Sequence, residues 1–172
     1  SIAADGEILA RGPNIMLGYF NKPEATRDVI DEDGWFHTGD IGELDSEGYL
    51  KITDRKKEII VMSNGKNVAP QPIENTLKTS PYIEQVVMLG NNQKYMAALI
   101  HPSLDMLDQY AHAQKLEVGS RKELLVHPDI LSFLDKEIHR MMADFARYEQ
   151  IKKFVLIEEE LTQENGFLTP TL

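Results

Sequence analysis

The sequence predicts an α+β fold, in which a small sheet packs against helices and is preceded by a β-rich segment. Residues 1–54 contain short alternating segments separated by glycine-containing turns, a pattern typical of strands. From residue 55 onwards the expected elements follow the order ββαββαααβ, and this partial alternation favours an α+β domain. The length of 172 residues, with 42% hydrophobic content, suffices for one ordinary core and a small appendage.

Residues 1–54 are expected to form a few strands and one short helix. Strands are predicted at 7–11, 41–44 and 49–53, and the turns between them have the sequences DEDGW and DSEG. Residues 21–30 have helical composition after a proline start. Because so few strands leave sheet edges uncovered, we interpret this segment as the tail end of a larger N-terminal domain.

A second domain is expected to occupy residues 55–172, because the character of the sequence changes at a basic cluster after Asp54. Asn64 and Gly65 form a dipeptide suited to a tight hairpin turn. The remaining elements are read from apolar periodicity and from start signals such as proline and serine. They are a helix at 70–79, strands at 85–90 and 95–101, a helix capped by Ser103 that continues to 115, helices at 121–126 and 129–148, and a last strand around Val155 and Ile157.

Composition excludes several classes of protein. With 28 acidic and 18 basic residues, the formal charge is -10, which disfavours nucleic acid and anionic lipid as partners. There are no cysteines, the first residues do not resemble a signal peptide, and no apolar run approaches the roughly 20 residues needed to cross a bilayer. We therefore expect a cytoplasmic protein without a transmembrane segment.

Most familiar catalytic motifs are missing from the sequence. It contains no Walker loop, no GxGxxG, no GxSxG and no HExxH. The five histidines are scattered without metal-ligand spacing, so we expect structural roles for them and no metal site.

Two short segments carry the candidate chemistry. In GWFHTGD, at residues 34–40, Asp40 follows a glycine that lets a ligand approach closely, so its two oxygens could accept both hydroxyls of a ribose. The alternative is that Asp40 caps a turn before the strand at Ile41. In ITDRKKEII, at residues 52–60, the planar donor fork of Arg55 suits a ribose or phosphate, whereas the alternative is a solvated linker.

These segments belong to a longer run of motifs that resembles a known superfamily. The sequences GEILARGPNIMLGYFNKPEAT and DGWFHTGDIGELDSEGYLKITDRKKEIIVMSNGKNVAPQPIE are similar to those of the adenylate-forming enzymes, which include acyl-CoA synthetases, adenylation domains and luciferases. The resemblance covers essentially the whole chain, with several motifs in family order and spacing. The segments ITDRKKEII, GKNVAPQPIE and ENGFLTPTL are most similar to the corresponding segments of long-chain fatty acyl-CoA synthetases.

The resemblance implies a role for individual residues in a mobile C-terminal lid domain. Asp40 and Arg55 match the pair that holds the adenylate ribose, and Lys57 matches the hinge about which the lid rotates. Gly65 matches the glycine that lines the pantetheine tunnel, and Lys66 beside it is assigned to CoA binding. Asn67 matches a neighbouring nucleotide-contacting position that is arginine in some members, so the asparagine is a departure that puts a phosphate contact there in doubt.

The resemblance also implies that catalytic groups lie outside the chain. In the family, a catalytic lysine follows the PTL-like tripeptide, which here ends at Leu172, so we assign no catalytic residue. The family's phosphate loop and acid pocket would lie before Ser1. We therefore expect the isolated chain to be inactive and to bind no cofactor tightly.

The implied function of the parent protein is that of a long-chain fatty acid–CoA ligase. Its substrates would be fatty acid, ATP with Mg²⁺, and CoA, used in two half-reactions separated by domain rotation. Peripheral membrane contact stays open for the parent. Two alternatives remain: an acyl-AMP ligase that passes the acyl group to a carrier protein, and a non-catalytic interaction module with the lid fold.

Overall fold

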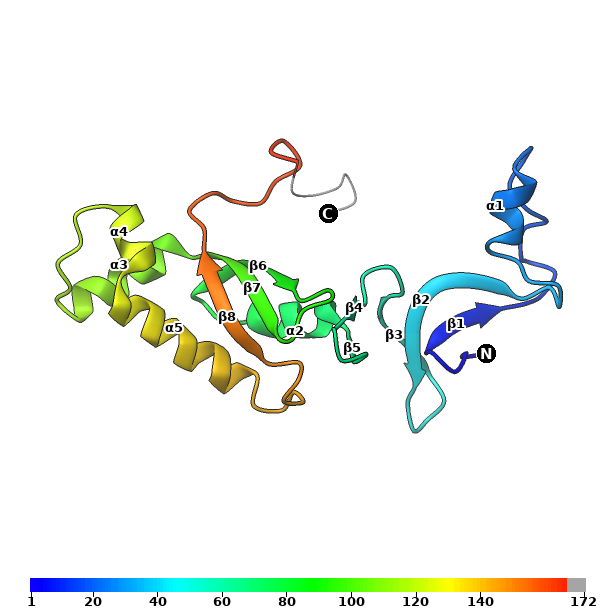
Figure 1. Cartoon of the computed structure of the whole chain (residues 1–172), viewed down its shortest axis with the longest axis horizontal. Helices are drawn as coiled ribbons and strands as arrows, with labels where there is room; N and C mark the ends of the chain where they lie inside the picture. The colour runs from blue at the N-terminus through cyan, green and yellow to red at the C-terminus, as the bar shows by residue number, and fades with distance from the viewer. Residues whose placement is uncertain (167–172) are drawn as a thin grey trace. The chain divides into compact units, whose positions relative to one another are not determined.

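The computed structural model describes residues 1–166 and shows a mixed α+β fold with small sheets and several helices, as the sequence predicts (Figure 1). The chain divides into two compact units, Ser1–Ile59 and Ile60–Leu172. The division falls five residues after the boundary expected from composition. The prediction of a terminal catalytic motif falls on residues 167–172 and lies outside the described residues.

The first unit is an antiparallel sheet of three strands in the order β1-β2-β3. These strands are β1 (Glu7–Ala10), β2 (Phe36–Leu44) and β3 (Leu50–Arg55), and the short helix α1 (Pro23–Arg27) lies in the long β1–β2 connection. The prediction of a strand at 41–44 was too short at its start. Phe36 and His37 pair with Ala10 and Leu9 of β1, so the aromatic segment gains ladder partners and joins the strand.

The second unit contains a two-stranded hairpin and a three-stranded sheet. The sheet has the order β6-β7-β8, with β6 antiparallel and β8 parallel to β7. The elements follow the expected order ββαββαααβ. They are β4 (Ile60–Val61), β5 (Asn67–Val68), α2 (Pro70–Leu77), β6 (Ile83–Leu89), β7 (Met96–Pro102), α3 (Leu104–Ala113), α4 (Arg121–Val126), α5 (Pro128–Met141) and β8 (Ile151–Leu156).

Two details of the helix predictions were wrong. Helix α5 ends at Met141 and not at Tyr148. Phe145 still packs against the core, and Gln150 bonds to the turns that follow the helix. Its side-chain amide donates to the carbonyl oxygens of Met142 and Phe145 at 3.5 and 3.3 Å. Ser103 does occupy the N-cap position of α3, but its side chain makes no capping hydrogen bond.

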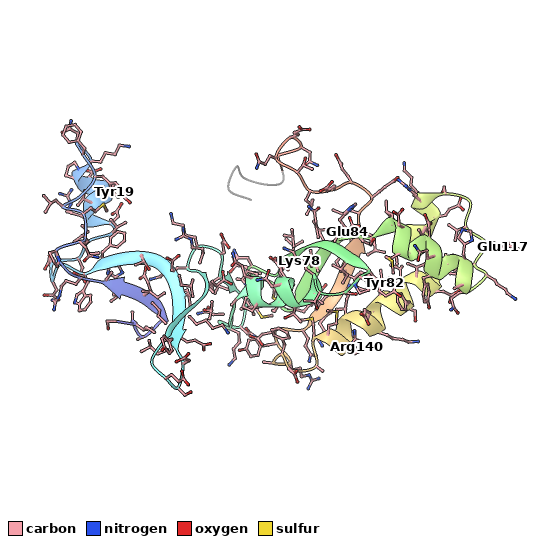
Figure 2. All side chains as sticks on the ribbon, turned by 180° about the vertical axis from the view of Figure 1, so that it is seen from behind. Tyr19, Lys78, Tyr82, Glu84, Glu117 and Arg140 are labelled. Atoms are coloured by element: carbon pink, nitrogen blue, oxygen red, sulfur yellow. The ribbon has the colours of Figure 1, made fainter. Side chains whose placement is uncertain are left out.

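The core of the second unit has two parts. The first lies between the three-stranded sheet and helices α2 and α5, which lie beside the sheet in Figure 1. The second joins α3, α4 and α5. At its margin Phe133 stacks on Tyr110, with ring centroids 4.0 Å apart, and meets the edge of Tyr82, which is labelled in Figure 2. These ring contacts join α3, α5 and the residue directly before β6.

Over residues 1–166, the helices lack the combination of length and apolar character that crossing a bilayer demands.

We expect Ile100→Ala to lower the free energy of unfolding by about 2–5 kcal/mol, because Ile100 lies fully buried on the central strand β7 and its loss leaves a cavity. Val155, on the adjacent strand β8, is exposed and serves as the matched control. Val155→Ala should change stability by less than about 0.5 kcal/mol. Denaturant unfolding of the 172-residue chain measures both, and equal effects would contradict the assignment of β7 to the core.

Candidate functional site

Asp40 and Arg55 lie side by side on neighbouring strands of the first unit. Their Cα positions are partners in the β2–β3 register. Arg55 Nη1 donates a hydrogen bond to Asp40 Oδ1 at 2.6 Å, and the side chains are 27% and 56% exposed for Asp40 and Arg55, respectively. The structure therefore brings these two predicted site residues together on an accessible surface.

The local backbone explains how Asp40 is presented. It lies inside β2, so it does not cap a turn before a strand, and the alternative interpretation of this residue was wrong. Gly39 has φ of +74°, which residues with a side chain rarely adopt. The Asp40 N–H donates to Thr38 Oγ1 at 3.1 Å, and Thr38 Oγ1 donates to the Ile8 carbonyl at 2.7 Å. The sequence Thr-Gly-Asp thus kinks the strand and fixes its carboxylate.

The ion pair has unused hydrogen-bonding capacity. Among residues 1–166 it uses one oxygen of Asp40 and one nitrogen of Arg55. A carboxylate has two acceptor oxygens, and a guanidinium has five N–H donors. The pair can therefore accept the hydroxyl protons of a diol while donating to its oxygens or to a phosphate.

A buried carboxylate supports this pair from behind. The Glu7 side chain is 4% exposed and accepts hydrogen bonds from His37 Nδ1 and Lys56 Nζ, both at 2.8 Å, and from the Gly39 N–H at 3.1 Å. Burial alone would raise the pKa of Glu7, but the hydrogen bonds from Lys56, His37 and Gly39 outweigh it and lower the pKa. Glu7 therefore stays ionised and holds the glycine that precedes Asp40.

The partners of Glu7 extend the network to further carboxylates. Lys56 Nζ also lies 2.8 Å from Asp5 Oδ2, and His37 Nε2 lies 3.6 Å from Asp31 Oδ2. The hydrogen bond to Glu7 raises the pKa of His37. The hydrogen bonds to Asp5 and Glu7 raise the pKa of Lys56. The protonated forms of both side chains are therefore favoured where the first and second strands meet the end of the third.

A pocket of about 620 Å³ opens beside this network within the first unit. It is lined by side chains of the β1–β2 connection and of the segment after β3, together with network residues. Arg55 belongs to the lining and Asp40 does not, so the pocket lies next to the ion pair. Its lining includes Tyr19, Phe36, His37, Arg55, Lys56 and Lys57.

The predicted hinge residue Lys57 lies in a turn directly after β3. The Glu58 N–H donates to the Arg55 carbonyl at 2.9 Å and closes the turn. Lys57 is exposed, and in the described part of the chain its side chain has no hydrogen-bond or ion-pair partner. The Lys57 side chain is therefore less constrained than those of Arg55 and Lys56.

The other predicted site residues lie together in the second unit, in the β4–β5 hairpin. Gly65 has φ of +77° and donates to the Met62 carbonyl at 2.9 Å. An added Cβ would meet nothing within 4 Å, so the positive φ alone demands glycine here. Lys66 Nζ lies 5.3 Å from the ring centroid of Tyr148, and Asn67 is exposed on β5. The hairpin therefore presents a bare backbone, an amine and an amide.

Glu7, His37 and Lys56 are the residues whose importance the sequence did not reveal. His37 was expected only to be structural, and Lys56 was given no role of its own within the basic run. The only sequence signal was a carboxylate at the start of a short predicted strand. Its burial, which requires a nearby cation, is visible only in the structure. Nothing in the spacing showed which of the nearby cations would supply it.

We expect the pKa of His37 to lie above its ordinary value of 6.5 and to fall when Glu7 is changed to Gln, because the carboxylate holds the imidazolium. This raised pKa contributes stability that is fully present below pH 6.5 and is lost as pH rises through the folded-state pKa. The lowered pKa of Glu7 contributes stability that is present above pH 4.5 and is lost on acidification. An NMR titration of the His37 ring protons measures the shift.

Glu43→Gln is the matched control for that titration, because Glu43 is an exposed carboxylate on the same strand as His37. It should leave the His37 pKa unchanged. A His37 pKa that is the same in the Glu7→Gln variant as in the unaltered protein would contradict the network.

Comparison with known proteins identifies the family. Residues 57–160 match the model of the AMP-binding enzyme C-terminal domain. A long-chain-fatty-acid–CoA ligase of Mycobacterium tuberculosis, FadD15, is 37% identical over 99% of this chain and 28% of its own length. Human long-chain-fatty-acid–CoA ligase 1 is 36% identical over 98% of this chain and 24% of its own length. The chain thus spans about a quarter of the curated relatives that it matches.

Solved structures agree with this assignment. The adenylation domain of a carboxylate reductase from Mycobacterium chelonae has a TM-score of 0.74 and 27% identity, over 95% of this chain and 24% of that one. The o-succinylbenzoate CoA synthetase of Bacillus subtilis, in complex with its acyl-adenylate intermediate, has a TM-score of 0.58 and 26% identity, over 89% and 27%. Since the family model matches more than half of the residues, the chain belongs to the AMP-binding enzyme C-terminal domain family of the adenylate-forming enzymes.

Proposed function

We propose that this chain is the C-terminal part of an ATP-dependent long-chain fatty acid–CoA ligase. The observation that carries the proposal is the ion pair of Asp40 and Arg55, which combines diol acceptors and phosphate donors on one surface. The names of the related ligases supply the substrate class. The AMP-bound and acyl-adenylate-bound structural relatives support an adenylate as the ligand.

The proposed reaction has two half-reactions. In the first, a carboxylate oxygen of the fatty acid attacks the α-phosphorus of ATP, and pyrophosphate leaves. In the second, the CoA thiolate attacks the acyl carbon, and AMP leaves with the bonding electrons. In both, Asp40 accepts from the ribose hydroxyls and Arg55 donates to the same nucleotide, so the sugar stays in place while the other groups change.

The hairpin and the hinge serve the second half-reaction in this proposal. The Cβ-free backbone at Gly65 allows the thin pantetheine arm to pass closely, and Lys66 supplies a positive charge for CoA phosphate. Asn67 can offer only a neutral amide to the nucleotide. Lys57, near the end of the first unit and just before this hairpin, is the residue about which the second unit turns.

Magnesium would accompany the triphosphate and neutralise its charge. Residues 1–166 contain no group of three or more His, Cys, Asp or Glu side chains placed to hold a metal ion. We therefore assign magnesium no ligand in this part of the chain.

A carrier protein is the alternative acceptor for the acyl group. Three of the similar solved structures are adenylation domains of carboxylic acid reductases, and one of the three was solved together with its PCP domain. Supplying the parent protein with CoA or with a carrier protein distinguishes the two acceptors.

In the full-length protein, Asp40→Asn should lower kcat/KM for ATP by about 10–100-fold, since a charged hydrogen bond to the ribose is worth about 1.5–3 kcal/mol. Steady-state kinetics of acyl-adenylate formation measure this loss. Glu43→Gln, on the same strand but exposed and away from the ion pair, should leave kcat/KM unchanged. Equal kinetics for both variants would remove Asp40 from the nucleotide site.

Lys57→Pro should spare acyl-adenylate formation and slow thioester formation by on the order of tenfold or more, because proline fixes φ at a residue that must change it. Single-turnover measurements of each half-reaction separate the two rates. Lys57→Ala leaves the backbone free, so it should retain both. An equal loss of both half-reactions in Lys57→Pro would contradict the hinge assignment.

A further inference from the structure

The basic run Arg55-Lys56-Lys57 contains three side chains with three different environments. Arg55 is paired with Asp40, and Lys57 has no ion-pair partner among residues 1–166. Lys56 lies between them and joins two carboxylates, Asp5 and Glu7, each at 2.8 Å. In a solvated linker, none of the three side chains would be expected to have fixed carboxylate partners. The pairing of Lys56 with two carboxylates therefore indicates a role different from those of Arg55 and Lys57.

Lys56 is attached through its main chain as well as its side chain. Its N–H donates to the Gly39 carbonyl at 2.8 Å, and the Gly39 N–H donates to Glu7 Oε1. Lys56, Gly39 and Glu7 therefore form a closed set of hydrogen bonds. This set joins the start of β1, the middle of β2 and the turn after β3.

The burial of Glu7 makes this attachment stronger than an ordinary surface ion pair. A carboxylate that is 4% exposed has lost most of its hydration, and removing a cationic partner leaves a buried charge undercompensated. Salt also screens a partly buried pair less than an exposed one. The connection to Asp5 lies at the surface and adds a second point of attachment.

The position of Lys56 along the chain gives this attachment its consequence. The two compact units divide between Ile59 and Ile60, three residues after Lys56, and the next residue, Lys57, is unconstrained by side-chain pairing. From this placement we propose that Lys56 is a positioning residue that fastens the chain to the first unit. Movement of the second unit then begins after Lys56, and Asp40 and Arg55 keep their alignment.

The catalytic consequence of this anchor rests on the proposed function. If motion began before Arg55, the guanidinium would move with the second unit and lose its register with Asp40. With the anchor in place, the nucleotide contacts stay fixed while the segment after Lys56 reorients. The anchor itself is a property of the first unit and is testable without any activity.

Hydrogen exchange in the full-length protein tests the anchor directly. In Lys56→Met, which keeps the aliphatic stem and removes the charge, peptides that contain Gly39 and Lys56 should exchange on the order of tenfold faster than in the unaltered protein. Lys51→Met is the matched control, because Lys51 is an exposed lysine on β3 whose only ion pair within residues 1–166 is long, at 4.0 Å. It should leave exchange unchanged, and Lys56→Arg should restore protection because it retains a cation.

Kinetics of the same variants test the consequence. Acyl-CoA formation by Lys56→Met should show a kcat lowered on the order of tenfold, restored to within about threefold by Lys56→Arg. Exchange that is equal in Lys56→Met and Lys51→Met, or no rescue by Lys56→Arg, would overturn the anchor. If the unaltered protein forms no acyl-adenylate from long-chain fatty acids, the proposed function fails, and exchange alone then decides for or against the anchor.

Discussion

The first unit depends on one buried charge. Glu7 lies at the start of a short strand, where a carboxylate without partners would be costly, and it is compensated by a lysine, a histidine and a backbone amide. Each of these donors comes from a different part of the sequence. The requirement to satisfy one side chain therefore organises all three strands, even though the unit has few fully buried apolar residues.

This arrangement separates residues that stabilise the unit from the two residues that we propose bind the nucleotide. Glu7, His37 and Lys56 face one another and satisfy each other's charges, whereas Asp40 and Arg55 retain hydrogen-bonding capacity toward the exterior. The separation is useful in a chain with a net charge of -10, because cations must be placed individually where an anionic ligand is to be met. Tyr19 and Phe36, in the adjoining pocket, add an apolar boundary to this surface.

Much of the fold could be predicted from sequence, because periodicity and start signals are local. The order of elements in the second unit followed from proline starts, the Asn-Gly turn and apolar spacing. The end of α5 could not be predicted, since Met142 and Phe145 maintain the apolar spacing after the backbone has left the helix. The Gln150 side chain donates to two carbonyl oxygens in the turns that follow the helix, and apolar spacing does not report these bonds.

In the candidate site, only the residues that belong to a family motif could be predicted from the sequence. Asp40 and Arg55 were found by resemblance, and the β2–β3 register explains why positions fifteen residues apart meet. The Glu7 network could not be found in this way, because Lys56 lies 49 residues from Glu7 in the sequence and no member is unusual by itself. Charge compensation in a buried place is a three-dimensional constraint.

The parallel strand β8 has a consequence for how the second unit is made. It lies against β7 at the side opposite β6, yet some fifty residues of helix and turn separate it from β7 in the chain. Because the ribosome synthesises the chain from the N-terminus, β6 and β7 are made before β8. The edge of β7 that pairs with β8 therefore has no partner until the segment around Ile151 is synthesised. Nascent chains that stall before that point would expose a strand edge to one another and invite association.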